Sequence, residues 1–130
     1  MVEWLEEQWK ALKTNEVWGL WKESFPIISG LTKETGIFDD EQLLIKLTWL
    51  LDTIGAKFGH EFKRMLNINA TDANTGTFSR FTEKTNTFDD FAEISVASSS
   101  LPGIFPSTKW GDKVFIDGGV IYGADLSSAV

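Results

Sequence analysis

The spacing of the hydrophobic residues changes about halfway along this 130-residue chain. Up to Ile54 the apolar side chains recur every three or four positions, which is the period of an α-helix. From Leu66 onward they alternate with Asn67 and Asn69, which is the period of a β-strand. The sequence therefore predicts an α/β fold with a helical first third and with short strands and a hairpin near the C-terminus.

Three helices are predicted before the first strand. The first carries an apolar stripe on one face, formed by Val2, Leu5, Trp9 and Leu12. A second, short helix is expected from a cap at Asn15 to Pro26, because proline ends helices. The third begins at Asp39, with Gln42 three residues later as in a capping box, and its leucine-rich stripe should face the core.

Tryptophan is concentrated at the start of the chain, where four of the six lie: Trp4, Trp9, Trp18 and Trp21. These side chains could form a membrane-contact or lid face, or a helical pair packed on a core. Interfacial helices usually carry lysine and arginine on the polar face, whereas this first helix carries glutamates. The charge pattern therefore favours a helical pair packed on a core over a membrane-contact face.

The second half of the chain contains the strand signals. A strand over 66–70 and a second over 77–82 flank the polar turn of 71–76. A helix capped by Asp89 or Asp90 should follow and stop at Leu101-Pro102-Gly103. The turn of residues 110–113 then leads into the apolar run Val114-Phe115-Ile116.

Asp117-Gly118-Gly119 directly follows that run and has two interpretations. An Asp-Gly pair between apolar runs is a strong hairpin signal, which would pair 114–116 with 120–122. Alternatively, a carboxylate ends a buried strand, and the two glycines let another backbone or a substrate approach closely. Local pattern favours the hairpin.

Composition and charge narrow the classes of function. The chain has 12 basic against 19 acidic residues, a net charge of −7 with no local basic patch, so we expect no nucleic-acid partner. The absence of cysteine excludes disulfide scaffolds and thiol enzymes, and His60 lacks the second histidine of a zinc-protease motif. We therefore expect no metal and no cofactor. With no export signal or membrane span, a cytoplasmic or peripheral-membrane location is favoured.

Several motifs occur together in the last third: the serine run 98–100, the segment Pro102-Gly103-Ile104-Phe105-Pro106, the turn of 110–113 and Asp117-Gly118-Gly119. In this order they closely resemble the C-terminal part of the patatin-like phospholipase domain. The segments 35–43 and 70–76 resemble the same family more loosely. The resemblance covers about residues 35 to 125 and implies a partial three-layer α/β/α fold.

The resemblance implies hydrolysis of lipid acyl esters, from phospholipids or acylglycerols, by a Ser-Asp dyad, with peripheral membrane contact. Asp117 matches the dyad aspartate, the proton acceptor, and Gly118 and Gly119 complete its motif. The family's nucleophile lies in G-x-S-x-G, and no serine here has glycine two positions before and after it. We therefore expect residues 1–130 to be the C-terminal portion of such a domain, with no nucleophile and no activity alone. Whether the helical segment 1–34 belongs to it is left open.

Two alternatives remain. The chain could be a non-catalytic patatin-like module for lipid or protein contact, or an unrelated small binding domain. The serines at 98–100 lack flanking glycines, so we expect them to pack a helix end against the core. If upstream strands are missing, the isolated chain should expose apolar surface.

Overall fold

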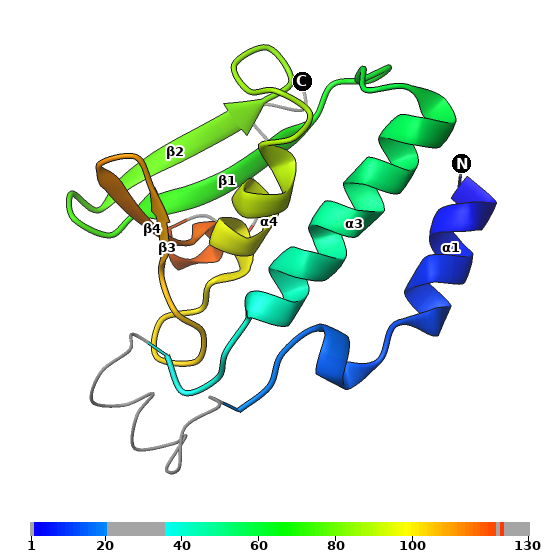
Figure 1. The fold of residues 1–130 in the computed structure, drawn as a ribbon. Helices are drawn as coiled ribbons and strands as arrows, with labels where there is room; N and C mark the ends of the chain where they lie inside the picture. Colours follow the sequence, from blue (N-terminus) through cyan, green and yellow to red (C-terminus); the bar gives the residue numbers. More distant parts are fainter. Residues whose placement is uncertain (1, 21–35, 122, 124–130) are drawn as a thin grey trace.

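The computed structural model describes residues 2–20, 36–121 and 123, and these form a four-stranded sheet with helices beside it (Figure 1). The strands are β1 (Asn67–Asp72), β2 (Thr77–Thr82), β3 (Thr108–Trp110) and β4 (Lys113–Asp117). The helices are α1 (Val2–Ala11), α3 (Glu41–Phe58) and α4 (Phe91–Ser99), with short 3-10 turns η1 (Thr14–Glu16) and η2 (Gly118–Val120). The predicted α/β fold is confirmed.

The sheet is antiparallel throughout, in the order β2-β1-β4-β3. The β1–β2 and β3–β4 hairpins turn at Gly76 and Gly111, whose positive φ angles of 67° and 62° favour glycine. These are the two turns that the sequence predicted. β4 joins the hairpins through a short pairing in which Ala70 lies opposite Asp117. The hairpins thus form one sheet with Asp117 at the end of a central strand.

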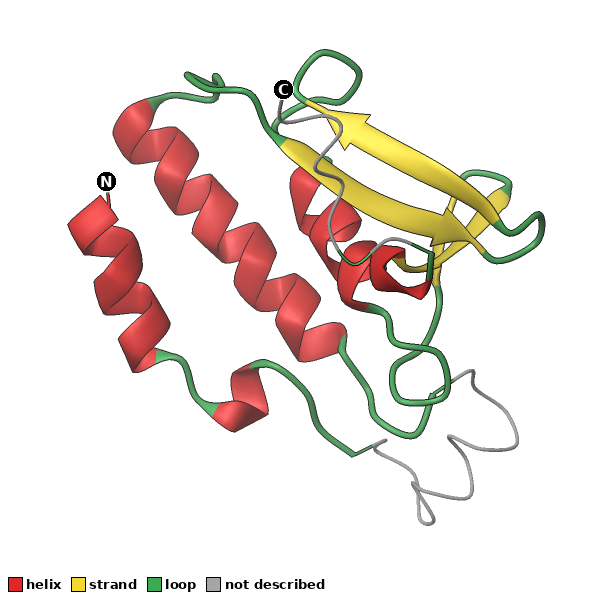
Figure 2. Ribbon diagram, turned by 180° about the vertical axis from the view of Figure 1, so that it is seen from behind, coloured by secondary structure: helices red, strands yellow, loops and turns green. Residues whose placement is uncertain are grey.

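Helix α4 packs directly on the sheet, and α3 packs on α4 (Figure 2). Ala97 of α4 meets Ala70 and Phe115, and around them lie Phe81 and Trp110, whose rings stack 5.5 Å apart. Five of the nine residues of α4 are buried. This small core fixes the position of α4 over β1 and β4.

Helix α3 differs at its start from the prediction, because its first residue is Glu41 and its N-cap residue is Asp40. The Asp39 carboxylate still accepts a hydrogen bond from the Glu41 backbone N–H at 3.0 Å. Asp40 makes no side-chain capping bond, and burial raises its pKa to about 6, with the neighbouring charge of Asp39 adding to the shift. Only Gly55 of this helix is fully buried, so its apolar stripe is only partly covered.

The predicted second helix is wrong over its described part. Only the 3-10 turn η1 forms, and Gly19 then pairs in extended conformation with Asp39, with N–H to O distances of 3.0 Å in both directions. Trp18 packs on Phe38, with the ring centroids 4.5 Å apart. A helical turn there would break both contacts. The rest of this predicted helix, including Trp21 and Pro26, lies outside the described residues.

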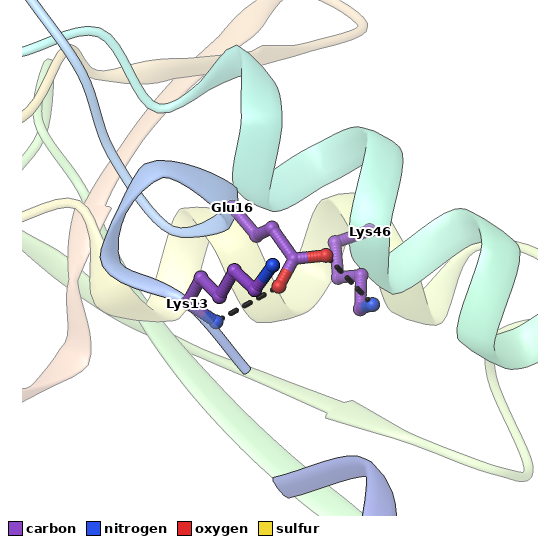
Figure 3. A network of polar contacts seen from close by, with 3 residues as sticks. All are labelled: Lys13, Glu16 and Lys46. Atoms are coloured by element: carbon purple, nitrogen blue, oxygen red, sulfur yellow. Dashed lines mark hydrogen bonds and ion pairs between the residues drawn. The ribbon is translucent and has the colours of Figure 1, made fainter. Parts of the chain in front are cut away.

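Glu16 ties the N-terminal segment to α3 (Figure 3). Its carboxylate accepts a hydrogen bond from the Lys13 backbone N–H at 2.8 Å and forms an ion pair with the Lys46 ammonium at 3.0 Å. These two donors, the backbone N–H first, lower the pKa of Glu16. The ammonium of Lys46 also lies 4.8 Å from the centre of the Trp49 ring.

Helices α1 and α3 turn their apolar stripes toward each other without closing the space between them. An apolar groove of about 520 Å³ lies there, lined by Val2, Leu5, Trp9, Leu12, Leu43, Leu47 and Leu50. No described residue of α1 is buried, and Trp9 is 78% exposed. The predicted packing therefore holds for Trp18, whereas Trp9 lies on the surface. Among the described residues, no helix has the length and hydropathy needed to cross a bilayer.

Candidate functional site

Asp117 stands where β4 ends and the chain turns into η2. Its backbone N–H donates to the carbonyl of Ser100 at 2.9 Å, which links the end of β4 to the end of α4. Its carboxylate oxygen Oδ1 accepts a hydrogen bond from the Gly119 N–H at 2.7 Å. In the described part of the chain the second carboxylate oxygen has no hydrogen-bond partner. The half-buried carboxylate is held in place by one oxygen and keeps the other available.

The hairpin interpretation of Asp117-Gly118 is wrong. A type I′ turn requires positive φ at both central residues, and neither of these residues has it. Instead, Gly118–Val120 form η2, capped by the Asp117 side chain. Ile121 follows as a turn rather than a strand, and Tyr122 lies outside the described residues.

Gly118 allows the backbone of η2 to lie close to the backbone of β1. A Cβ atom at this position would lie 2.4 Å from the carbonyl oxygen of Asn69 in β1, a separation that atoms do not tolerate. A Cβ at Gly119 would lie 3.2 Å from the Asp117 carboxylate oxygen Oδ1, a tight but less severe contact. Gly118 therefore sets η2 directly against β1, and this contact holds Asp117 at the end of the central strand β4.

An open cavity of about 560 Å³ adjoins Asp117. Polar groups from β1, α4 and the β4–η2 junction form most of its wall: Asn67, Asn69, Ser95, Ser98, Asp117 and Gly119. Among the described residues of this wall, Ile68 is the single large apolar one and none carries a positive charge. The cavity joins the predicted site residue to polar side chains that the sequence analysis did not select.

The three consecutive serines have different environments. Ser100 is fully buried, and its hydroxyl bonds the carbonyl of Val96 at 2.8 Å and the hydroxyl of Thr108 at 3.2 Å. Ser99 is exposed and bonds helix carbonyls. Ser98 lines the cavity, and its hydroxyl makes no hydrogen bond to any described residue. The predicted packing against the core is thus right for the buried Ser100 and wrong for the exposed Ser99, while Ser98 is half-buried at the cavity wall.

Asn69 is a further cavity residue that the sequence reasoning missed. Its side-chain oxygen Oδ1 is buried and has no hydrogen-bond partner in the described part of the chain. In the sequence, the alternation of Asn67 and Asn69 with apolar residues indicates only a strand. Two asparagines at alternate positions just before a buried segment could have indicated a polar surface at the strand edge.

Metal-binding clusters of three or more His, Cys, Asp or Glu residues are absent from the described ranges. His60 is exposed, lies edge-on to Phe88 at 5.4 Å and has its Nδ1 atom 3.9 Å from an Asp89 carboxylate oxygen. His60 therefore lies on the surface. The chemistry that the cavity offers is therefore that of one carboxylate surrounded by amides and hydroxyls.

Comparison with known proteins gives one match. A family model described as patatin-like phospholipase matches residues 3–130, which includes the α1 segment, the cavity and Asp117. No curated protein and no solved structure matches the chain. The motifs that resemble this family all lie within the matched range. The chain therefore belongs to the patatin-like phospholipase family.

Proposed function

We propose that residues 1–130 form the C-terminal portion of a serine acyl hydrolase domain that cleaves lipid esters, namely phospholipids or acylglycerols. Membership of the patatin-like family supports action on lipid acyl esters in general. In this proposal Asp117 is the general base of a Ser-Asp dyad, and sequence outside this chain supplies the nucleophilic serine. No cofactor is required, because both groups of the dyad are side chains.

One observation carries the proposal for Asp117. Its carboxylate faces an open cavity with Oδ1 fixed by the Gly119 N–H, while its other oxygen has no partner in the described ranges. A general base needs a lone pair within hydrogen-bond reach of the reacting hydroxyl, and it needs a fixed orientation. The hydrogen bond from the Gly119 N–H supports a fixed orientation of the Asp117 carboxylate. The second carboxylate oxygen supports contact with the serine hydroxyl.

The reaction would proceed in two steps. The Asp117 carboxylate takes the serine proton as the serine oxygen attacks the ester carbonyl, and that proton then passes to the departing alcohol. A water molecule, deprotonated in the same way, releases the acid from the acyl-enzyme. A free carboxylate is a weak base for an alcohol, because the reference pKa of aspartate is about 3.9. The step therefore depends on a dry, closed site in the complete domain.

The experiment compares two aspartates in the full-length gene product. Asp117→Asn should lower turnover of a short-chain chromogenic ester by about 10²- to 10⁴-fold, the usual contribution of general-base catalysis. Asp112→Asn, in the exposed β3–β4 turn, is the matched control and should leave turnover unchanged. Equal turnover by wild type and Asp117→Asn would overturn the assignment.

The source of the nucleophile has its own test. The reading frame upstream of Met1 should encode a glycine-rich loop and G-x-S-x-G, and residues 1–130 alone should hydrolyse no ester. Turnover by residues 1–130 alone, abolished by Asp117→Asn, would contradict an external nucleophile. A full-length product with no such serine and no turnover would instead support a non-catalytic module.

Peripheral membrane contact is part of the proposal, because lipid esters reside in membranes. Co-sedimentation of the full-length gene product with phosphatidylcholine vesicles, at low and at physiological salt, measures it. We expect binding that changes little with salt, because phosphatidylcholine vesicles carry no net charge that salt could screen. Absence of the protein from the pellet at both salt concentrations would contradict this contact.

A further inference from the structure

Ser100 follows helix α4 in a tight turn that directs its carbonyl group toward β4. Its backbone angles, φ −76° and ψ 76°, and the 2.9 Å hydrogen bond from the Leu101 N–H to the Ser99 carbonyl are those of an inverse γ-turn. The turn points the Ser100 carbonyl away from the helix direction, and this carbonyl accepts the Asp117 N–H at 2.9 Å. The bond joins the end of α4 to the residue proposed as the general base.

The side chain of Ser100 holds this turn from inside the protein. Its hydroxyl bonds the Val96 carbonyl at 2.8 Å and the Thr108 hydroxyl at 3.2 Å, and the residue is fully buried. Because a carbonyl oxygen can only accept, Ser100 gives its single proton to Val96, and Thr108 donates to the Ser100 oxygen. The Ser100 hydroxyl therefore gives the last turn of α4 a buried donor where the helix backbone has ended.

Thr108 closes these bonds into a ring around the end of β4. It begins β3 and lies opposite Phe115, two residues before Asp117 in β4. The path from Asp117 through Ser100 and Thr108 to Phe115 returns to Asp117 along the β4 backbone. Because Phe115 belongs to the buried core, the ring fixes the last residues of β4 relative to both α4 and β3.

The ring is complete within the described part of the chain. Ser100 is 0% exposed and Phe115 is 4% exposed, so no upstream segment is needed to form or to cover their contacts. A segment that packs on the cavity beside Asp117 would meet a backbone that is already held in place. The position of Asp117 is therefore set from the interior of this portion and not from the cavity.

We infer that Ser100 is a positioning residue for Asp117, which it holds through its carbonyl, and that the Thr108 hydroxyl supports it. This inference rests on the proposed function. Ser100 contacts no reacting atom and takes no part in proton transfer. A displacement of about 1 Å can cost about 10²-fold in rate, so a loosened base should lower kcat rather than raise KM.

Turnover of a short-chain chromogenic ester by the full-length gene product tests this role. Ser100→Ala should lower kcat about tenfold and leave KM within about twofold, because the base moves while the ester contacts remain. Ile94→Val is the matched control for lost stability, since it removes one buried methylene from the same helix, and it should leave kcat unchanged. An unchanged kcat in Ser100→Ala would overturn the inference.

Thr108 offers a rescue by a conservative variant. Thr108→Val keeps the shape of the side chain but removes the donor to Ser100, and it should lower kcat about threefold. Thr108→Ser keeps the hydroxyl and should turn over the ester at the wild-type rate. Equal kcat values in the two variants would overturn the supporting role of the Thr108 hydroxyl.

A double variant shows whether the effect passes through Asp117. In an Asp117→Asn background the base is absent, so adding Ser100→Ala should lower the residual kcat by less than about twofold. A further loss of about tenfold would overturn the inference and leave Asp117 as the base. Wild-type turnover by Asp117→Asn alone would instead overturn the proposed function. Fluorophosphonate labelling of Ser100→Ala should still go to completion, because the nucleophile is retained.

The hydrogen bond between Ser100 and Asp117 can also be followed without turnover. Amide hydrogen exchange of the full-length gene product, measured by NMR, should be at least about tenfold faster at the Asp117 N–H in Ser100→Ala than in Ile94→Val. Exchange in the β1–β2 hairpin should be the same in both variants. Faster exchange that extends equally to the hairpin would indicate general loosening of the fold and would overturn the positioning role.

Discussion

Gly118 lies so close to Asn69 that a Cβ atom on the glycine would be 2.4 Å from the carbonyl oxygen of the asparagine. The contact joins η2 to β1 at the point where Asp117 leaves the sheet. Because Gly118 has no positive φ, its role here is steric rather than conformational. A side chain at this position would push η2, and with it the neighbouring Asp117, away from β1.

Gly118→Ala should therefore destabilise the full-length gene product by about 1–3 kcal/mol, the range for an overpacked interior. Gly119→Ala should cost less than about 1 kcal/mol, because its Cβ meets only the end of a side chain at 3.2 Å. Urea denaturation followed by tryptophan fluorescence measures both. A Gly118→Ala variant as stable as Gly119→Ala would show that the β1–η2 contact leaves room for a Cβ atom at position 118.

Ser100 and Ser99 form a second matched pair. Ser100→Ala removes two hydrogen bonds and leaves the Thr108 hydroxyl without one of its partners, so we expect a loss of about 1–2 kcal/mol of unfolding free energy. Ser99→Ala, at an exposed site, should change it by less than about 0.5 kcal/mol. Neither substitution, nor Ser98→Ala, should alter labelling of the full-length product by a fluorophosphonate probe. Loss of labelling in any of the three would make that serine a candidate nucleophile.

Asp40 gives a pH dependence of stability. Its folded pKa, raised by burial to about 6, exceeds the ordinary value of 3.8, so the folded state favours the protonated form. Stability from this group is complete below pH 3.8 and falls as the pH rises through about 6.

Asp40→Asn should remove that loss and raise the unfolding free energy at pH 7 by about 1–2 kcal/mol, allowing for the solvent that still reaches the half-buried carboxylate. At pH 3.5 the variant and the wild type should be equally stable. The comparison is made by urea denaturation at the two pH values. A variant less stable than wild type at pH 7 would indicate that the Asp40 charge is stabilising.

The contribution of Glu16 to stability should change with pH in the opposite direction to that of Asp40. The folded pKa of Glu16 is lowered by the Lys13 backbone N–H and by Lys46. The stabilising effect of Glu16 is therefore present above the ordinary pKa of 4.5 and is lost as the pH falls through the folded pKa. Glu16→Gln should therefore lose stability at pH 7 but not at pH 3, and high salt should reduce the difference. Thermal unfolding at the two pH values tests this. A difference that persists at pH 3 would assign the effect to packing.

The apolar stripes of α1 and α3 predict how residues 1–130 behave alone. The groove between these helices and the exposed Trp9 leave hydrophobic surface open to water, so the isolated chain should bind a dye such as ANS and unfold without a sharp transition. Circular dichroism and ANS fluorescence measure both. A sharp, cooperative transition without dye binding would contradict loose packing.

Sequence periodicity was sufficient for the main helices and hairpins, because each is defined by contacts near in sequence. The spacing of leucines from Leu43 to Ile54 is enough to predict a helix, and the polar turns that contain Gly76 and Gly111 are enough to predict the two hairpins. The predicted second helix failed for a non-local reason: Gly19 pairs with Asp39, and Trp18 packs on Phe38, about twenty residues away. Local propensity contains no information about such partners.

At the site, the sequence by itself determined the family motif and Asp117 as its acidic residue. Only the tertiary structure decided between a hairpin and a close approach at Gly118, since both use glycine and they differ in the backbone φ angles and in what lies opposite. It also brought Ser98 and Asn69, 29 positions apart in the sequence, to one cavity wall. The physical reason is that a motif records which residue types a backbone tolerates. Hydrogen-bond partners and steric neighbours are set by packing between segments distant in sequence.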